Sequence, residues 1–578
     1  MNHILEPILA NARRLQAAPC LHYKKGGQWQ VMSWKKMEAT VMNWACGLIA
    51  LGLKPGDRVA ILSPTRMEWV LADLAIFAAG GIVVPIYPTL TQEQAEYILA
   101  DADVHVAFLS EPHELSSPHL ISFDMTMSRG RFLSLDDLVA RGRSVSRDCV
   151  EAAFRSLTPQ TVATYVYTSG TTGRQKGAIL TQGNIVAEIQ AALEIFCLRP
   201  DEIGLVSLPL AHVLGRMGAL YQLAQGCQSA FAESMEKLAE NYRDVRPHLT
   251  IGVPRMLEKL YERVLETVRR SPSWKRRLFA WGRGVLDQAF EVRRHHRNIS
   301  LFLQFKAKVA DVVIARPLRK RLGGRLRIFV SGGAPLSKEV ARFLISFGVT
   351  VLEGYGLTET FAAVAVNRPD DFHVGTVGKA LSGVQIKIAP DGEILVKGGM
   401  VFQGYVNLPE ETSAAFEEEG WLKTGDIGEY SKDGFLRITD RKKDLIATAG
   451  GKKIAPQPIE ALLTRSMYID QAMLEGDRKP YLVALLTINI PAVEAYGKQQ
   501  GYETGGALAK QEWVRSLIAA DIERVNAQVA QFESIKRFAI LPTALTVEAE
   551  ELTPTLKVRR RAVAEKYRDV IEQLYAAS

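Results

Sequence analysis

The chain has 578 residues, of which 47% are hydrophobic and 23% are charged. At roughly 150 residues per domain, this length predicts about four core units, and the apolar content is too high for an intrinsically disordered chain. The 71 Lys and Arg residues outnumber the 63 Asp and Glu residues, and the net charge of +8 raises the question of an anionic partner.

The five cysteines indicate neither a disulfide framework nor a zinc site, because they are scattered, odd in number and without a CxxC pair. The first residues, MNHILEPILANARR, lack the basic start and the unbroken apolar stretch of a signal peptide. We therefore expect a cytoplasmic protein in a reducing compartment.

The strongest candidate for a membrane-spanning helix lies at 69–88. It approaches the ~20 apolar residues that a spanning helix needs, but it contains an acidic residue, two glycines and two prolines. A helix followed by a buried strand at 82–86 explains it better, with Gly80 as the helix stop. The residues that would share one face of that helix are Met67, Val70, Leu71, Leu74 and Phe77.

Apolar runs at 58–62, 82–86 and 104–109 alternate with helical stretches and predict a doubly wound α/β sheet. From about Gly375, the short runs VQIKIAP, GEILVKG and GFLRITD predict a small β-rich subdomain. After Asp440 the pattern is mixed α+β, and we place a domain boundary there, between domains 1–439 and 440–578. The chain is expected to end in one amphipathic helix that carries Val563, Tyr567, Val570, Ile571 and Leu574 on one face.

The segment 167–177, YTSGTTGRQKG, predicts a phosphate-binding loop after a buried strand. Its glycines let backbone amides approach phosphate oxygens, its hydroxyls add donors, and Lys176 supplies a positive charge. It is not a Walker A loop, because Lys176 is followed by Gly177 and the glycine spacing differs. A standard P-loop NTPase is therefore disfavoured.

The same segment resembles the phosphate loop of the adenylate-forming (acyl-CoA synthetase, AMP-binding) enzymes. Further segments resemble that family in its own order and extend over about residues 20–575: LPLAHVLGR at 208–216, SGGAPL at 331–336, EGYGLTET at 353–360, GTVGKAL at 375–381, GWLKTGDIG at 420–428, DRKKDLIATAGGKKIAPQPIE at 440–460 and TPTLKVRRR at 553–561. The resemblance implies a large N-terminal domain of doubly wound sheets with a small β-rich subdomain, and a smaller mobile α+β C-terminal domain.

The resemblance also assigns roles to residues. Those implied to bind ATP or AMP are Thr168, Ser169, Gly170, Thr171, Thr172, Gly173, Lys176, Gly333, Ala334, Pro335, Gly354, Tyr355, Gly356, Thr358, Asp426 and Arg441. Within this set, Tyr355 stacks on adenine, Thr358 meets the α-phosphate, and Asp426 and Arg441 hold the ribose. Glu359, with Thr168, is implied to hold Mg²⁺, a hard cation that prefers oxygen ligands.

The catalytic residues implied are Lys557, His212 and Thr358. Taken alone, His212 would be a core histidine and Lys557 a solvated lysine. By resemblance, His212 lies beside the acyl carboxylate, and Lys557 stabilises the charge that develops as pyrophosphate leaves.

The family implies two reactions with ATP, Mg²⁺ and coenzyme A: formation of an acyl-adenylate, then transfer of the acyl group to the CoA thiol. Asp440 is the implied hinge, and Gly450, Gly451 and Lys452 lie on the CoA side. The closest subgroup is the bacterial long-chain fatty acid CoA ligases, from VPIYPTL at 84–90 and VPRMLEKLY at 253–261. Four residues depart from the usual pattern, namely Gln175, Gln182, Ala447 and Ala449.

Two alternatives remain open. One is a fatty acyl-AMP ligase that loads an acyl carrier protein, and the other is a non-enzymatic basic protein that binds a membrane. Residues 269–327 contain 17 Lys and Arg against three acidic residues. Their first half predicts a basic amphipathic helix that would suit an anionic membrane at the inner face or pack on the enzyme. We expect no nucleic-acid partner. The acyl chain length stays open, and a homodimer is compatible with the sequence.

Overall fold

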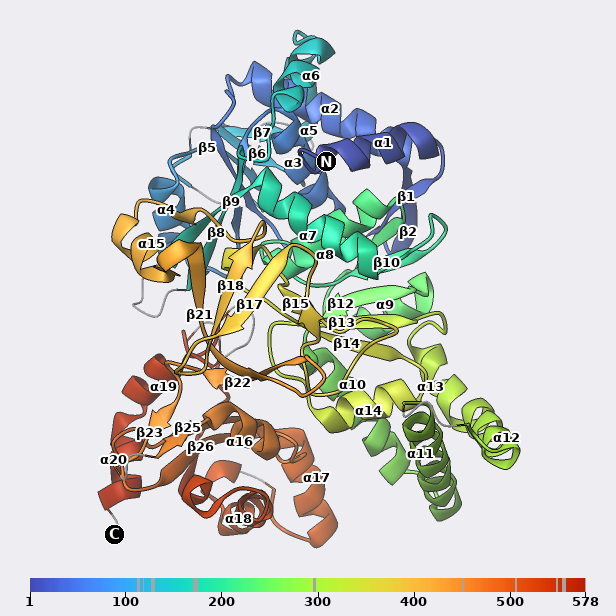
Figure 1. The fold of residues 1–578 in the computed structure, drawn as a ribbon, viewed down its shortest axis with the longest axis vertical. Coiled ribbons are helices and arrows are strands. Elements are labelled where there is room, and N and C mark those ends of the chain that lie inside the picture. Colours follow the sequence, from blue (N-terminus) through green and yellow to red (C-terminus); the bar gives the residue numbers. More distant parts are fainter. Residues whose placement is uncertain are drawn as a thin grey trace. The chain divides into compact units, whose positions relative to one another are not determined.

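The structure is a computed structural model that describes residues 1–111, 115–117, 119–125, 130–169, 175–294, 298–449, 452–504, 507–546, 549–553 and 558–576. It is an α/β protein whose chain divides into two compact units (Figure 1). The first comprises 1–387, 395–424 and 430–437, and the second comprises 388–394, 425–429 and 438–578. The larger unit therefore contains the phosphate-loop strand, and the smaller contains Asp440.

An eight-stranded sheet forms one half of the first unit. Its order is β19 (Gly404–Tyr405), β9 (Gln175–Thr181), β8 (Val162–Ser169), β4 (Ile82–Ile86), β3 (Arg58–Leu62), β5 (Val104–Leu109), β6 (His119–Ser122) and β7 (Phe132–Ser134). The strands from β8 to β7 are parallel, whereas β9 runs antiparallel to β8 and to β19. The three strands predicted at 58–62, 82–86 and 104–109 are confirmed as β3, β4 and β5.

The 69–88 segment is also confirmed as a helix and a strand. The helix α3 (Met67–Ala78) is buried except at Glu68, Gly80 adopts φ +79° after its end, and β4 follows. Positive φ is a conformation that glycine adopts without steric cost, which explains the helix stop. Throughout the described chain, each helix is too short or too polar to cross a bilayer.

A nine-stranded sheet forms the other half. Its order is β16 (Lys379–Ala380), β15 (Ala365–Val366), β14 (Thr350–Tyr355), β13 (Ile328–Ser331), β12 (Leu249–Gly252), β10 (Ile203–Val206), β11 (Gln228–Phe231), β1 (Pro19–Lys25) and β2 (Gln28–Ser33). The strands from β14 to β1 are parallel, so their carboxyl ends meet at one edge. The chain's first strand, β1, pairs with β11 through Leu21 and Ser229.

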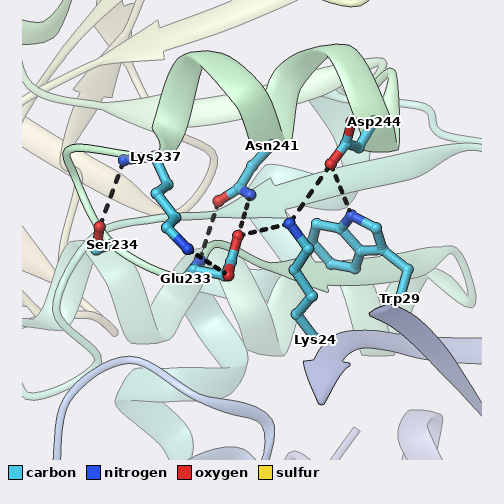
Figure 2. Close-up of polar contacts among 7 residues, drawn as sticks. All are labelled: Lys24, Trp29, Glu233, Ser234, Lys237, Asn241 and Asp244. Atoms are coloured by element: carbon cyan, nitrogen blue, oxygen red, sulfur yellow. Dashed lines mark hydrogen bonds and ion pairs between the residues drawn. The ribbon is translucent and has the colours of Figure 1, made fainter. Parts of the chain in front are cut away.

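Polar side chains hold this edge hairpin to the helix α9 (Leu238–Val245), as Figure 2 shows. The ammonium of Lys24 lies 2.8 Å from Glu233 and 3.6 Å from Asp244, and the Trp29 indole donates to Asp244 at 3.1 Å. Lys24 and the Asn241 amide lower the pKa of Glu233 to about 2. This cluster is structural, because every group in it is bound to another.

Helices cover both sheets of the first unit. They are α1 (Leu5–Leu15), α2 (Trp34–Ala50), α4 (Gln92–Asp101), α5 (Leu135–Gly142), α6 (Arg147–Arg155), α7 (Gln182–Ile195), α8 (Val213–Gln225), α10 (Pro254–Arg269), α11 (Ser273–Arg294), α12 (Leu301–Ala310), the π-helix η1 (Asp311–Ala315), α13 (Arg316–Arg321), α14 (Lys338–Ser346) and α15 (Pro409–Ala415). The largest core takes side chains from both sheets and from α1, α2, α3, α7 and α8.

The predicted β-rich subdomain is present as a five-stranded sheet. It contains β17 (Val384–Ile388), β18 (Glu393–Gly398), β21 (Trp421–Tyr430), β20 (Phe416–Glu417) and β22 (Leu436–Arg441). The runs VQIKIAP, GEILVKG and GFLRITD correspond to β17, β18 and β22.

The second unit has the mixed α+β character that the sequence predicts. It contains β23 (Ile446–Ala447), β24 (Lys453–Ile454), α16 (Pro456–Leu463), β25 (Ile469–Glu475), β26 (Leu482–Ile488), α17 (Ile490–Gln500), α18 (Glu512–Asn526), β27 (Ile535–Ile540), α19 (Arg560–Lys566) and α20 (Arg568–Ala576). The prediction of a single terminal helix is wrong. Tyr567, at φ −105° and ψ 25°, separates α19 from α20, and its hydroxyl donates to Glu551.

One buried ion pair connects the two large sheets. Arg216 on α8 and Asp73 on α3 are each 1% exposed, and Nε and Nη2 of Arg216 donate to the two carboxylate oxygens at 2.9 and 2.5 Å. Nη1 donates to the hydroxyl of Thr164 on β8, which donates to the carbonyl of Val83 on β4. The acidic residue that argued against a membrane helix is thus neutralised inside the core.

Removal of one member of this pair should destabilise the first unit strongly. Asp73→Ala leaves the Arg216 guanidinium buried without its carboxylate, and we expect a loss of about 3–5 kcal/mol in the free energy of unfolding. Urea unfolding followed by tryptophan fluorescence measures it. Asp73→Leu combined with Arg216→Met should lose less than Asp73→Ala. Arg155→Ala, in the exposed pair with Glu151, is the control and should change stability by about 0.5 kcal/mol or less. Equal stability of Asp73→Ala and wild type would contradict the expectation.

Candidate functional site

Several predicted site residues follow the carboxyl ends of neighbouring parallel strands. The segment with His212 follows β10, Gly333, Ala334 and Pro335 follow β13, and Tyr355 is the last residue of β14. Figure 1 shows β12, β13 and β14 side by side. Ligands of open α/β sheets bind in the crevice outside the carboxyl ends of the strands. The fold therefore gathers these motifs at one sheet edge.

The backbone at this edge is open to a ligand. Residues 333–335 are exposed, and Gly333 adopts φ +82° with space around the position of a Cβ. Tyr355 is 9% exposed, and its strand continues into Gly356. A Cβ at Gly356 would lie 1.5 Å from the carbonyl oxygen of Ala362, so only glycine lets the chain fold back there.

His212 is the N-cap residue of α8. Its Nδ1 accepts a hydrogen bond from the backbone N–H of Leu214 at 3.1 Å. A neutral imidazole that accepts at Nδ1 carries its proton at Nε2, so this ring is a donor through Nε2. The cap accounts for the orientation of the ring, which sequence reasoning did not foresee.

The phosphate-loop segment joins β8 to β9 as an antiparallel hairpin in which Thr168 pairs with Lys176. The residues Gly170, Thr171, Thr172 and Gly173 lie outside the described residues, and of Ser169 only the backbone is described. The ammonium of Lys176 lies 5.6 Å from the ring centre of Tyr405 and 4.0 Å from the carboxylate of Glu411. Lys176 is thus held at the base of the hairpin by contacts from β19 and α15.

The turn η2 (Thr358–Thr360) carries Thr358 and Glu359 next to β9. The Tyr405 hydroxyl donates to Oε1 of Glu359 at 2.8 Å, and the backbone N–H of Phe402 donates to the Glu359 carbonyl at 2.8 Å. Burial and the neighbouring Glu359 raise the pKa of Tyr405. Tyr405 therefore contacts both Lys176 and Glu359 and links the phosphate hairpin to the turn.

The helix α7 holds the turn from the other side. Asn184 donates to the carbonyls of Gly399 and Val401 at 2.8 and 2.9 Å, and the N–H of Ala363 donates to Oε1 of Glu188 at 3.1 Å. Glu188 is fully buried, and burial raises its pKa to about 8. Its Oε2 has no hydrogen-bond partner among the described residues. Glu188 therefore carries a proton at neutral pH.

Sequence reasoning missed Tyr405, Asn184 and Glu188. A signal for Glu188 was available, because Ile185, Glu188, Ile189 and Ala192 follow the three- and four-residue spacing of a buried helix face. An acidic residue on such a face needs a partner. Tyr405 carried no comparable signal, because its partners come from β9 and η2.

The second unit brings together Asp426 and Arg441, the predicted ribose-binding pair. Nε of Arg441 lies 3.0 Å from Oδ1 of Asp426, which is 3% exposed. Beside them, Lys442 bridges Asp391 and Glu393 at 2.6 and 2.7 Å. A buried carboxylate with an arginine at one oxygen is suited to accept hydrogen bonds from hydroxyl groups.

Asp440, the predicted hinge, is a buried carboxyl in β22 whose Oδ1 accepts from the backbone N–H of Arg441 at 2.6 Å. Burial raises its pKa to about 6. The exposed Lys452 lies over the Phe532 ring at 5.7 Å. Lys557, Gly450 and Gly451 lie outside the described residues.

Two family models match the chain. One is described as AMP-binding enzyme and matches residues 9–406, and the other is described as AMP-binding enzyme C-terminal domain and matches residues 443–578. The chain is 40% identical over 563 residues to the long-chain-fatty-acid–CoA ligase FadD15 of Mycobacterium bovis, covering 95% of this chain and 93% of that protein. It is 31% identical to the long-chain-fatty-acid–CoA ligase ACSBG2 of Xenopus laevis, with 96% and 81% covered.

Solved structures confirm the fold. The adenylation domain of a carboxylate reductase from Mycobacterium chelonae has a TM-score of 0.78 at 23% identity, covering 99% of this chain and 91% of that one. The corresponding domain from Segniliparus rugosus, solved with AMP and a co-purified carboxylic acid, has a TM-score of 0.76 at 21% identity, with 100% and 94% covered.

The protonation of Glu188 predicts a pH dependence of stability. Its pKa is about 8 in the folded chain against an ordinary value of 4.5. Between these values the folded protein holds a proton that the unfolded chain has released, so stability falls as the pH rises. Glu188→Gln cannot titrate, and we expect it to lose less unfolding free energy than wild type between about pH 5 and pH 8. Urea unfolding at several pH values measures this. Glu194→Gln, exposed on the same helix, should follow wild type. Parallel pH curves for wild type and Glu188→Gln would refute a buried, protonated Glu188.

Proposed function

Because the chain belongs to the AMP-binding enzyme family, we propose that it activates a long-chain fatty acid with ATP and transfers the acyl group to coenzyme A. The observation that carries the proposal is its 40% identity over 95% of its length to a long-chain-fatty-acid–CoA ligase. The products are pyrophosphate from the first step, and fatty acyl-CoA and AMP from the second.

The two steps follow from carboxylate chemistry. A carboxylate resists attack by a thiol because it is anionic and offers a poor leaving group. In the first step, a carboxylate oxygen attacks the α-phosphorus of ATP, the bond to the β-phosphate oxygen breaks, and pyrophosphate leaves. In the second step, the CoA thiolate attacks the carbonyl carbon of the neutral mixed anhydride, and AMP leaves with the electron pair of the broken bond.

In this proposal the nucleotide lies along the carboxyl edge of the nine-stranded sheet. Tyr355 stacks on adenine, residues 333–335 line the base through their backbone, and Thr358 meets the α-phosphate. Asp426, oriented by Arg441, accepts hydrogen bonds from the ribose hydroxyls. His212, at the start of α8, lies beside the acyl carboxylate in this proposal.

The phosphate-loop residues neutralise the phosphates of ATP in this proposal. Lys176 supplies a positive charge, and Thr168, Ser169, Thr171 and Thr172 supply hydroxyl donors, while Gly170 and Gly173 expose backbone N–H groups. The position of Lys176 beside Tyr405 and Glu411 supports this role.

Glu359 and Thr168 would hold Mg²⁺ together with phosphate oxygens of ATP. The donor set fits, because Mg²⁺ is usually bound by one or two carboxylates and by substrate phosphates. The Tyr405 hydroxyl donates to Glu359 and orients the carboxylate for this purpose. The cation would supply charge neutralisation at the phosphates.

We assign the change between the two steps to rotation of the domain 440–578 about Asp440. Lys557 would serve the adenylation step, and Gly450, Gly451 and Lys452 would lie along the path of the CoA pantetheine. A buried carboxyl at the end of a strand, where a few backbone dihedral angles can absorb a rotation, supports Asp440 as the hinge.

We also propose a contact with anionic membranes through residues 269–327, with their 17 Lys and Arg residues. A fatty acid partitions into a bilayer, so an enzyme that uses it benefits from a position on the bilayer surface. Each Lys or Arg near an anionic surface contributes about 1 kcal/mol.

An ATP–pyrophosphate exchange assay tests the proposed activity. We expect exchange that depends on a fatty acid, because adenylation is reversible and returns labelled pyrophosphate to ATP. The assay should compare C8 to C18 acids as substrates. Acyl transfer should also be measured with CoA and with an acyl carrier protein as the acceptor. No exchange with any of these acids would refute the proposal, and transfer to the carrier protein alone would favour an acyl-AMP ligase.

Lys557→Ala separates the two half-reactions. We expect exchange to fall by about 10²–10³-fold, the usual effect of removing one group that stabilises developing charge. Thioester formation from supplied acyl-adenylate and CoA should continue at nearly the wild-type rate. Lys536→Ala, which removes an exposed lysine of the same unit, is the control. A similar loss in both half-reactions would show that Lys557 is not specific to the first step.

A further inference from the structure

Part of the apolar face of the basic helix α11 packs inside the protein. Its Phe279 ring lies 6.4 Å from the ring of Phe343 and 6.0 Å from that of Phe347, and Leu286 is buried in the same core. The prediction that this helix packs on the enzyme is therefore confirmed for this face. Trp274 and Trp281 of the same helix stay 61% and 38% exposed.

The next helical segment exposes a longer run of apolar side chains to the solvent. Along α12 and η1, apolar side chains face the solvent at three- and four-residue spacing, which places them on one side of a helix. These residues, which we call the α12 stripe, are Leu301, Phe302, Phe305, Val309, Val312 and Val313, with exposed fractions of 83%, 68%, 67%, 37%, 47% and 44%.

The exposure of the α12 stripe is not explained by the packing of the segment. The inner face, with Leu303, Ala307, Ala310 and Ala315, already fills the second core of the first unit. A surface helix normally presents polar residues opposite its buried face. A contiguous apolar surface beyond that face is typical of a contact with another phase or molecule. Figure 1 shows α12 at the periphery, beside α11 and α13.

Positive charge borders the α12 stripe. Residues 298–321 contain six Lys and Arg against one acidic residue, Asp311, and Asp311 already pairs with Arg319 at 2.7 Å. Lys306 lies 4.1 Å from the ring centre of Phe302, so its ammonium borders the aromatic surface. Lys308, Arg316 and Lys320 are exposed on the same segment. Aromatic and aliphatic side chains framed by Lys and Arg are typical of helices that lie in the interface of an anionic bilayer.

We propose that α12 and η1 insert as an interfacial element into anionic membranes, with the α12 stripe at the level of the acyl chains and the bordering Lys and Arg at the lipid phosphates. The inference rests on the membrane contact proposed above and names the element that enters the bilayer. A second copy of the chain is a poorer occupant, because it would bring two positively charged borders together. An anionic lipid surface offers acyl chains to the α12 stripe and phosphates to the bordering Lys and Arg residues.

Vesicle flotation tests the insertion. Wild type should float with phosphatidylglycerol–phosphatidylcholine vesicles, and part of this binding should survive about 0.5 M NaCl, because apolar burial is not screened by salt. In Phe302→Ser/Phe305→Ser/Val309→Ser, binding at low salt should fall at least about tenfold, since interfacial binding scales with buried apolar area. The salt-resistant fraction should disappear. Because the substituted side chains are exposed, the variant should keep the wild-type thermal unfolding temperature and ATP–pyrophosphate exchange with a fatty acid in detergent micelles.

The matched control is Val31→Ser/Met235→Ser/Ile490→Ser, which removes three exposed apolar side chains elsewhere and should bind vesicles as wild type does. If the stripe variant binds as wild type does at both salt concentrations, insertion by α12 is wrong while the membrane contact stands. If wild type does not bind vesicles, the membrane contact itself fails, and the exchange assay decides on the ligase activity separately. A wild-type dimer that dissociates in the stripe variant, with vesicle binding unchanged, would assign the stripe to a second copy and overturn the proposal.

Discussion

The buried pair of Arg216 and Asp73 joins the two large sheets of the first unit, and the candidate site depends on this connection. Arg216 lies on the helix between β10 and β11 of the nine-stranded sheet, and through Thr164 it reaches the centre of the eight-stranded sheet. The same helix begins at His212, and the strand of Thr164 leads into the phosphate loop. One guanidinium therefore links the helix that follows His212 to the strand that precedes the phosphate loop. Its position over the rings of Trp69 and Phe77, at 5.7 and 5.3 Å, surrounds the charge with polarisable groups.

The turn with Thr358 and Glu359 is fixed by a different principle. Glu188, a buried neutral acid, accepts a hydrogen bond from the backbone near the turn, and the Asn184 amide donates hydrogen bonds to it. The Tyr405 hydroxyl donates a hydrogen bond to the Glu359 side chain. Phe361, directly after the turn, adopts φ +61°, a left-handed conformation that costs energy for a residue other than glycine. Fixed backbone bonds on both sides maintain this conformation. Thr358 and Glu359, for which we propose contacts with ATP and Mg²⁺, are thereby supported by groups outside those proposed contacts.

Local sequence patterns predicted the strands β3, β4 and β5 correctly, because buried parallel strands are short apolar runs bounded by Gly, Pro and polar residues. They also marked the segments with His212, residues 333–335 and Tyr355, because those motifs are contiguous, whereas their common position at one sheet edge comes from the structure. They could not predict the partners of Arg216 or Glu188, which come from elements distant in the chain. The break at Tyr567 was also missed, because neither a proline nor a glycine marks it in the sequence. The exposure of Phe302 and Phe305 depends on which face of α12 the core takes, and a residue pattern that is apolar on both faces does not specify this.

The pairing of β1 with β11 has a consequence for how the chain is made. Leu21 pairs with Ser229, and the strands of the other large sheet from β3 to β9 lie between them in the chain. During synthesis the hairpin of β1 and β2 leaves the ribosome long before its neighbouring strand exists, so one edge of β1 has unpaired N–H and C=O groups for that time. Unpaired strand edges and long-range pairings favour slow folding and aggregation. The seven strands β3 to β9 of the eight-stranded sheet are complete before β11 is made, and only β19 follows later. The hairpin of β1 and β2 must wait for β11 before it can join the nine-stranded sheet. Nascent chains that stop short of β11 are therefore the species most in need of a chaperone.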